Sequence, residues 1–154
     1  MMKKLRIYID TSVIGGYFDD EFNADTRLLF EEILRGEYKL VISDLTVREL
    51  VNAPERVRTL LRDLKIDFEV IAVTQESIDL ASDYINEKVV GQTSLDDCIH
   101  IATATIHKLD LLVSWNFKHI VNVIRIRGYN SINLRNGCST LEIRSPKDLI
   151  NYEN

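Results

Sequence analysis

Short runs of β-branched and other apolar residues alternate with helical patterns along the chain, and this alternation restricts the fold more than any other feature. It is typical of a parallel sheet whose strands are joined by helices. Strands are predicted at Leu5–Ile9, Lys39–Ser43, Phe68–Val73, Leu111–Ser114 and Thr140–Ile143. Helices are predicted at Ala24–Arg35, Leu45–Ala53, Pro54–Leu64, Ile78–Val89, Ser94 to about His107, and Phe117–Asn136. The sequence therefore predicts an α/β fold.

Local chemistry predicts details of two helices. Thr74 is expected to cap the helix at Ile78–Val89, since a threonine hydroxyl can accept from a free amide of the first turn. Gly128 is expected to weaken the helix at Phe117–Asn136. The buried stripe of the first helix is predicted at Ile78, Ala81, Ile85 and Val89.

Length and composition indicate one folded domain over residues 1–154, with 45% hydrophobic and 28% charged residues. The two cysteines, Cys98 and Cys138, have no CxxC spacing, so we expect reduced thiols and a cytoplasmic location. The apolar stretch near the start is interrupted by Arg6 and Asp10, which argues against a signal peptide. No apolar run approaches the ~20 residues that span a bilayer, so no membrane association is expected.

The formal net charge of −5 argues against a module that binds nucleic acid mainly by neutralising phosphates. A nucleic-acid role would need a metal ion or a local basic patch. Basic residues do occur late in the chain, without forming one helical stripe: Lys118, Arg125, Arg127, Arg135 and Arg144.

Four polar side chains are expected near one edge of the predicted sheet. Asp10 follows the first strand, and Asn116 follows the strand at Leu111–Ser114. Asp97 lies in the first turn of its helix, and Glu49 lies in a short helix directly after a strand. Ligands of open α/β sheets bind beyond the carboxyl ends of the strands, so these side chains predict a site there.

Three converging carboxylates repel one another unless a cation lies between them. Oxygen ligands without cysteine or paired histidine favour Mg²⁺ or Mn²⁺. Such an ion polarises a phosphoryl oxygen and activates a water, which is the chemistry of phosphodiester hydrolysis.

Each acid also has a structural interpretation. Asp10 alone is equally well a helix N-cap, and Asp96 and Asp97 suit the positive end of a helix dipole. Glu49 alone would be a surface residue. His100 follows Asp97 by one helical turn, and we interpret it as a buried, hydrogen-bonded core histidine.

Four segments together resemble the PIN domain, the metal-dependent ribonuclease fold of the toxins in many bacterial and archaeal toxin–antitoxin pairs. They occur in the family's order and are Ile7–Ser12, Val47–Leu50, Asp97–Ala104 and Leu112–Phe117. The resemblance implies a three-layer sandwich around a five-stranded parallel sheet in the order 3-2-1-4-5. It also implies a small antitoxin partner.

The resemblance assigns the metal site to Asp10, Glu49 and Asp97. Asp97 is chosen over Asp96 because it directly precedes the small and apolar run of its helix. Many PIN domains have a fourth acid where this chain has Asn116. An amide adds no negative charge, so Asn116 is expected to position a water or the scissile phosphate.

The sequence thus predicts a Mg²⁺- or Mn²⁺-dependent endoribonuclease whose catalytic residues are Asp10, Glu49, Asp97 and Asn116. A homodimer is expected through the apolar helix at Ile78–Val89. One alternative is a non-catalytic RNA-binding or scaffold protein with a degenerate metal site. Another is a phosphatase-like hydrolase with Asp10 as nucleophile, which Ser12 disfavours because a second acid is expected at that position.

Overall fold

Five parallel strands form one sheet in the order β3-β2-β1-β4-β5, as predicted. The computed structural model describes residues 3–91 and 95–150. The strands are β1 (Leu5–Ile9), β2 (Tyr38–Ser43), β3 (Phe68–Ile71), β4 (Leu111–Val113) and β5 (Glu142–Arg144). The order reverses at β1, which pairs with both β2 and β4.

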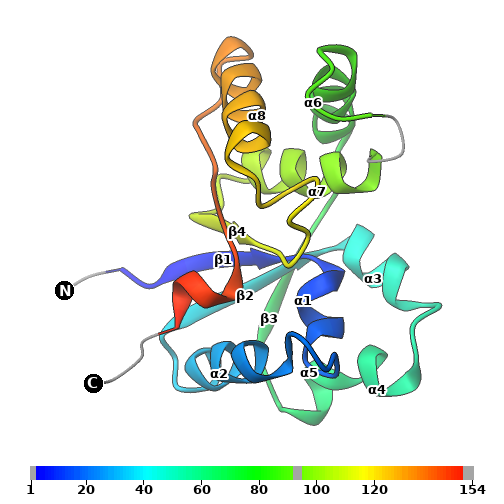
Figure 1. Ribbon diagram of the computed structural model, residues 1–154, viewed down its shortest axis with the longest axis vertical. Helices are drawn as coiled ribbons and strands as arrows, with labels where there is room; N and C mark the ends of the chain where they lie inside the picture. Colours follow the sequence, from blue (N-terminus) through cyan, green and yellow to red (C-terminus); the bar gives the residue numbers. More distant parts are fainter. Residues whose placement is uncertain (1–2, 92–94, 151–154) are drawn as a thin grey trace.

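Helices cover both faces of the sheet, which gives the molecule three layers (Figure 1). One face carries α1 (Thr11–Gly16), α2 (Asn23–Leu34), α4 (Glu55–Arg58), α5 (Leu60–Asp63) and the 3-10 helix η2 (Pro146–Leu149). The other face carries α6 (Gln75–Asn86), α7 (Leu95–Ile106) and α8 (Val123–Arg135). The short helix α3 (Asp44–Leu50) follows β2 at the edge where the strands end.

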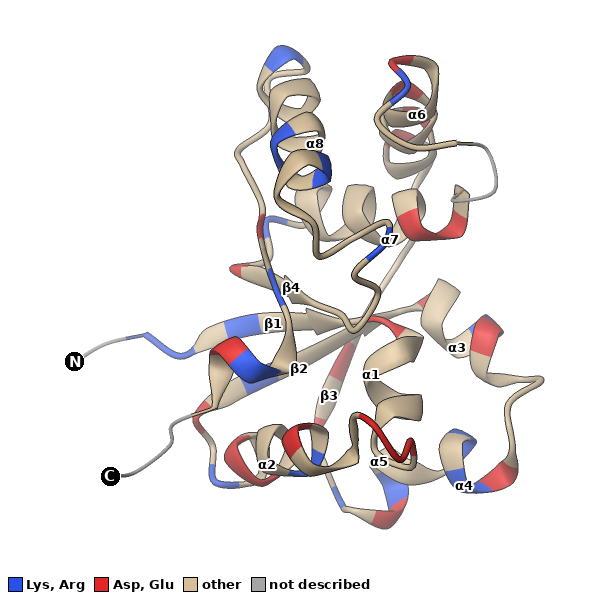
Figure 2. Ribbon diagram, viewed as in Figure 1, with Lys and Arg blue, Asp and Glu red and all other residues tan. Residues whose placement is uncertain are grey.

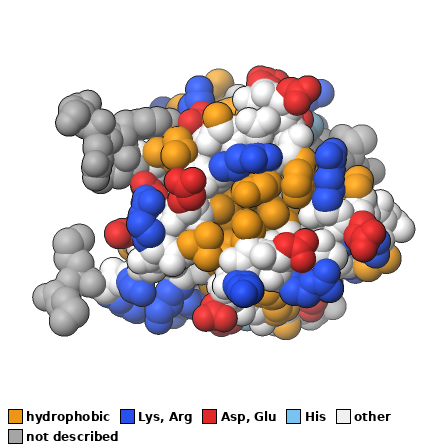
Figure 3. Space-filling model, turned by 90° about the horizontal axis from the view of Figure 1, so that it is seen from below, with side chains coloured by type: hydrophobic (Ala, Val, Ile, Leu, Met, Phe, Trp, Pro, Cys, Tyr) orange, Lys and Arg blue, Asp and Glu red, His pale blue; other side chains and the backbone are white. Residues whose placement is uncertain are grey.

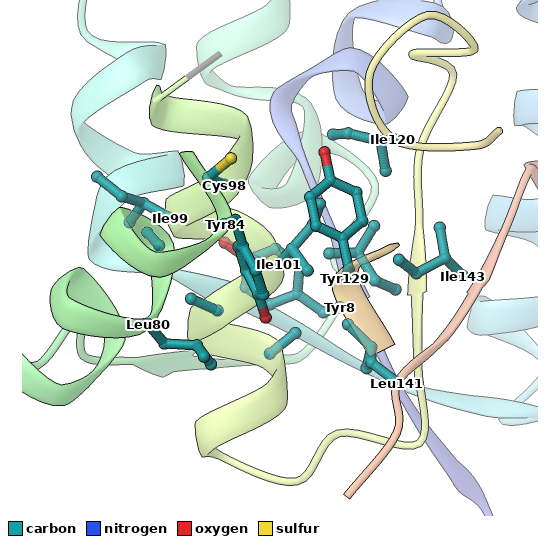
Figure 4. Packing of buried hydrophobic residues seen from close by; sticks show 14 of the residues in the cluster. Tyr8, Leu80, Tyr84, Cys98, Ile99, Ile101, Ile120, Tyr129, Leu141 and Ile143 are labelled. Carbon is teal, nitrogen blue, oxygen red and sulfur yellow. The ribbon is translucent and has the colours of Figure 1, made fainter. Parts of the chain in front are cut away.

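Successive side chains of β1 point to opposite faces of the sheet and so belong to two separate cores. Tyr8 packs with the α6, α7 and α8 layer, whereas Ile7 and Ile9 pack with the α1 and α2 layer. All three side chains are fully buried. Full burial of each large apolar side chain contributes about 1.5–3 kcal/mol, so the two cores stabilise the central strand from both sides. Figure 4 shows the first of these cores.

The end of the chain differs most from the predicted elements. The last helix begins at Val123 and not at Phe117, because Asn122 caps it by accepting from the amides of Ile124 and Arg125. Gly128 does not interrupt this helix. A Cβ added there would lie 2.9 Å from Val89, so the glycine allows close packing. The last strand falls at Glu142–Arg144 and not at Thr140–Ile143.

Two other helical predictions need correction. The segment Pro54–Leu64 forms two short helices separated at Thr59, whose hydroxyl donates to the Glu55 carbonyl (3.0 Å). Thr74 caps α6 as predicted. The buried face of α6 consists of Ser77, Leu80, Ala81 and Tyr84. Of the predicted stripe, Ala81 is buried and Ile85 and Val89 pack partly buried against the core, whereas Ile78 is exposed. The predicted helix start at Ser94 lies outside the described residues.

This face of α6 packs inside the chain, against α7 and α8. It therefore cannot serve as the dimer contact that the sequence suggested. Over residues 3–91 and 95–150, no helix has the length and apolar character needed to cross a membrane.

Gly16 gives a test of how α1 packs. A Cβ at Gly16 would lie 2.8 Å from the Trp115 ring and 3.0 Å from the Thr26 hydroxyl, whereas a Cβ at Gly15 meets nothing within 4 Å. We expect Gly16→Ala to lower the free energy of unfolding by about 1–3 kcal/mol through overpacking. Gly15→Ala should raise it by about 0.5–1 kcal/mol, because alanine favours the helix. Urea unfolding of both variants checks this, and equal effects would contradict the packing.

Candidate active site

The predicted site residues lie where β1, β2 and β4 end. Asp10 directly follows β1, Glu49 lies in α3 after β2, and Asn116 follows β4 by three residues. Asp97 lies in the first turn of α7. In Figure 1 this edge is where α1 and α3 begin, close to the first turn of α7, and Figure 2 shows acidic residues just before α1, in α3 and in the first turn of α7.

Asp10 is buried, with 4% of its surface exposed. It caps α1 by accepting from the Val13 amide (3.3 Å), so the structural interpretation of this residue holds. Its carboxylate also accepts from the hydroxyls of Ser12 (2.5 Å) and Ser114 (2.6 Å). Burial raises the pKa of Asp10, while the charge of His100 and the two serine hydroxyls oppose this shift.

Asp97 is half-buried and contacts Asn116, whose side-chain amide donates to Asp97 Oδ2 (3.1 Å). Burial and then the negative charge of Asp10 raise the pKa of Asp97, with a smaller contribution from Glu49. The three carboxylates therefore interact, as expected for acids gathered at one edge. The neighbouring Asp96 is exposed, which agrees with the choice of Asp97.

Asn116 has two roles in the structure. Its Nδ2 donates to Asp97, while its Oδ1 accepts from the His119 amide (3.0 Å) and so fixes the turn after β4. Its own amide donates to Ser114 Oγ (2.9 Å). A chain of hydrogen bonds thus joins Asp97 to Asp10 through Asn116 and Ser114.

Glu49 is held by two partners at one oxygen. Its Oε1 lies 2.8 Å from Thr11 Oγ1, which donates, and 2.6 Å from His100 Nε2. Burial would raise the pKa of Glu49, but the hydrogen bond and charge of His100 outweigh it, so the pKa is lowered. Glu49 is thereby held as a carboxylate.

His100 is buried and hydrogen-bonded at both ring nitrogens, as the sequence suggested. What the sequence did not indicate is that one partner is Glu49, with Tyr8 on the other side. A buried tyrosine in an otherwise aliphatic strand needs a hydrogen-bond partner, and Tyr8 was the available signal.

The donor set is made of oxygens and fits a hard divalent cation. Within the described residues, no three Asp, Glu, His or Cys side chains are grouped closely enough to bind one ion directly. Mg²⁺ keeps several waters and is usually bound through one or two carboxylates. The carboxylate oxygens of Asp10, Glu49 and Asp97 are of the kind that such an ion takes, with waters completing its coordination.

The aromatic residues on either side of Asn116 differ. Trp115 is buried, stacks on Phe22 with ring centroids 4.3 Å apart, and donates to the Thr26 hydroxyl (2.8 Å). Phe117 is 47% exposed. Trp115 thus anchors the loop, as aromatic residues beside a site often do.

Three of the late basic residues have partners within the chain. Arg135 pairs with Glu87 (3.0 Å), Arg144 pairs with Glu142 (3.1 Å), and Arg125 donates to the Val89 carbonyl. Figure 2 shows basic residues along α8.

Comparison with known proteins identifies one family. The family model described as PIN domain matches residues 7–118. No curated protein matches the chain.

Solved structures resemble the chain in fold. A toxin–antitoxin complex from Klebsiella pneumoniae is 21% identical, with 73% of this chain and 88% of that chain covered and a TM-score of 0.53. VapBC2 from Rickettsia felis, bound to a DNA fragment from its promoter, is 14% identical, with 92% and 98% covered and a TM-score of 0.58. VapC20 of Mycobacterium tuberculosis, a toxin that cleaves the sarcin–ricin loop, is 12% identical, with 73% and 91% covered and a TM-score of 0.56.

Proposed function

The chain belongs to the PIN-domain family, and from this premise we propose that it is a Mg²⁺- or Mn²⁺-dependent endoribonuclease that acts as a cytoplasmic toxin. The observation that carries the proposal is the gathering of three acids at one edge of the sheet: Asp10 follows β1, Glu49 lies in α3 after β2, and Asp97 in the first turn of α7 is joined to Asp10 by hydrogen bonds through Asn116 and Ser114. Such a cluster is costly in a metal-free protein and is neutralised by a divalent cation. The toxin role rests on neighbours that are toxin–antitoxin proteins.

In this proposal Asp10 and Asp97 bind the ion directly. The bound ion would lower the pKa of a water and polarise a phosphoryl oxygen. Thr11 and His100 hold Glu49 through Oε1, so the second oxygen, Oε2, is the one that accepts a proton from the attacking water. Asn116 donates its side-chain amide to Asp97 and, in this proposal, orients a water or the scissile phosphate.

Metal titration with a substrate comparison tests the function. The protein should bind Mn²⁺ in calorimetry, cleave RNA only with Mg²⁺ or Mn²⁺, and leave a small phosphomonoester intact. RNA binding without cleavage at any metal concentration would favour the non-catalytic alternative. Hydrolysis of the phosphomonoester would favour a phosphatase with Asp10 as nucleophile.

The proposed partners are an RNA substrate and a small antitoxin. The antitoxin rests on the neighbours, of which one is a toxin–antitoxin complex and another is VapBC2 bound to promoter DNA. Seen from below, the molecule has hydrophobic side chains gathered among Lys and Arg side chains (Figure 3), which suits contact with a protein. Co-expression with the product of a short neighbouring gene should yield a co-purifying complex that cleaves RNA more slowly than the isolated protein.

We also propose a homodimer, with a contact surface different from α6. Exposed hydrophobic side chains lie on and just after α3 and on the edge strand β3, at Val47, Val51, Phe68 and Val70. Val51 is 64% exposed, so Val51→Glu should leave the fold intact and place a charge in the contact. Light scattering should report a dimer for the wild type and a monomer for Val51→Glu. A monomeric wild type at micromolar concentration would contradict the proposal.

A further inference from the structure

A buried chain of hydrogen bonds runs behind Glu49, away from the carboxylate cluster. Tyr8 extends from β1 into the core, and its hydroxyl contacts His100 Nδ1 and lies 2.7 Å from Ser43 Oγ. The opposite ring nitrogen of His100 lies 2.6 Å from Glu49 Oε1. Tyr8, Ser43 and His100 are each at most 2% exposed. These hydrogen bonds therefore connect the acidic site to the buried core beside the sheet.

The direction of these hydrogen bonds follows from the chemistry of each group. A carboxylate only accepts, so His100 Nε2 carries the hydrogen that it shares with Glu49. On the opposite side of the ring, Nδ1 is hydrogen-bonded to the Tyr8 hydroxyl. Burial raises the pKa of Tyr8 well above its usual value, so the tyrosine keeps its proton. The Tyr8 hydroxyl is thus hydrogen-bonded to both His100 and Ser43.

The surroundings fix Tyr8 in one position. Ser43 ends β2 and caps α3, the helix that carries Glu49, by accepting from the Thr46 amide (3.4 Å). The same serine therefore fixes both the start of this helix and the hydroxyl of Tyr8. His100 lies on α7, one turn after Asp97. The hydrogen bonds of Tyr8 thus link α3 and α7, the two helices that supply acids to the site.

We propose that Tyr8 and His100 are positioning residues, which together hold the Glu49 carboxylate at the orientation that the metal site needs. This inference rests on the proposed function. It gives His100 a role beyond core packing, because the ring is hydrogen-bonded to Glu49 and lowers the pKa of that acid. Partners that orient metal-site carboxylates commonly change metal affinity or activity about 10-fold to 100-fold when they are removed.

A matched pair of tyrosine variants separates positioning from stability. Tyr84 is also fully buried, belongs to the same core as Tyr8 (Figure 4), and donates its hydroxyl to Asn133 on α8. Tyr8→Phe and Tyr84→Phe each remove one buried hydroxyl. We expect both to lower the melting temperature, and only Tyr8→Phe to weaken Mn²⁺ binding in calorimetry by about 10-fold.

Two histidine variants test which ring nitrogen matters. The side-chain amide of glutamine reaches about as far as Nε2 and can still donate to Glu49, whereas asparagine reaches only to about Nδ1. We expect His100→Gln to retain Mn²⁺ affinity within a few-fold of wild type and His100→Asn to lose about 10-fold, although both lower the melting temperature. In the metal-free wild type, ¹⁵N NMR of the imidazole should show the hydrogen on Nε2.

The outcomes distinguish this inference from the proposed function. If wild type binds Mn²⁺ but Tyr8→Phe binds it as well as Tyr84→Phe does, the positioning role is wrong and the proposed function stands. Equal affinities for His100→Gln and His100→Asn would lead to the same conclusion. If wild type neither binds Mn²⁺ nor cleaves RNA, the proposed function fails and the positioning role fails with it.

Discussion

Asp97→Asn is expected to lower RNA cleavage on the order of 100-fold at a fixed Mn²⁺ concentration while raising the melting temperature of the metal-free protein. The loss follows from removing one of the two acids that we propose bind the ion directly. The gain in stability follows from the pKa of Asp97, which burial and the charge of Asp10 raise in the folded state. An acid whose pKa is higher when folded destabilises the protein as pH rises past its usual value, because ionisation then costs more in the folded state.

The pH dependence of this variant is therefore informative. At neutral pH the metal-free variant should melt above wild type. Near pH 3 the difference should vanish, because the carboxyl group is then largely protonated in both the folded and the unfolded chain. Adding Mn²⁺ at neutral pH should stabilise wild type more than the variant. Melting curves at both pH values, with and without Mn²⁺, check each part.

Asp96→Asn is the matched control, since Asp96 occupies the same helix turn and is exposed. Both variants remove one negative charge near the start of α7. The control should retain cleavage and the Mn²⁺-induced stabilisation. A loss of equal size in Asp96→Asn would mean that helix charge, and not a ligand, explains the effect.

Asp10→Asn should also weaken Mn²⁺ binding at least about 10-fold, and normal binding by both Asp10→Asn and Asp97→Asn would exclude the proposed metal site.

The strands could be predicted because the residues that specify each one are neighbours in the sequence. Each strand is a short apolar run bounded by turn or helix signals, and the strand order followed from the resemblance carried by the segments between Ile7 and Phe117. Element ends were harder to predict. β5 pairs with only three residues of β4, with Val113 opposite Arg144, so its position depends on the neighbouring strand more than on its own sequence.

The placement of the acids near one edge of the sheet could be predicted, but the groups that hydrogen-bond them could not. Asp10, Glu49 and Asp97 could be selected because each lies close after a strand or at a helix start. The partners of Glu49 are Thr11 and His100, and these lie 38 and 51 residues away along the chain. No local spacing indicates such contacts. His100 was assigned to the core because its own surroundings are apolar, and only the fold brings it to Glu49.

Asn116→Asp is expected to have opposite effects with and without metal. Asn116 now donates to Asp97 Oδ2 at 3.1 Å, and aspartate would replace that donor with a second carboxylate. The two anions would repel each other in the metal-free protein, which should lower its melting temperature. With saturating Mg²⁺ or Mn²⁺, the added hard oxygen ligand should tighten metal binding about 10-fold and preserve or raise RNA cleavage.

The hydrogen bond by which Asn116 fixes the turn after β4 is kept in this variant, because the introduced carboxylate can still accept from the His119 amide through one oxygen. Asn122→Asp is the matched control. Asn122 caps α8 by accepting from the Ile124 and Arg125 amides, and aspartate is an equally good cap. Its effect on the melting temperature should be small and independent of metal. If Asn116→Asp shifts the melting temperature equally with and without Mn²⁺, Asn116 acts only as a cap, and the fourth position of the site lies elsewhere.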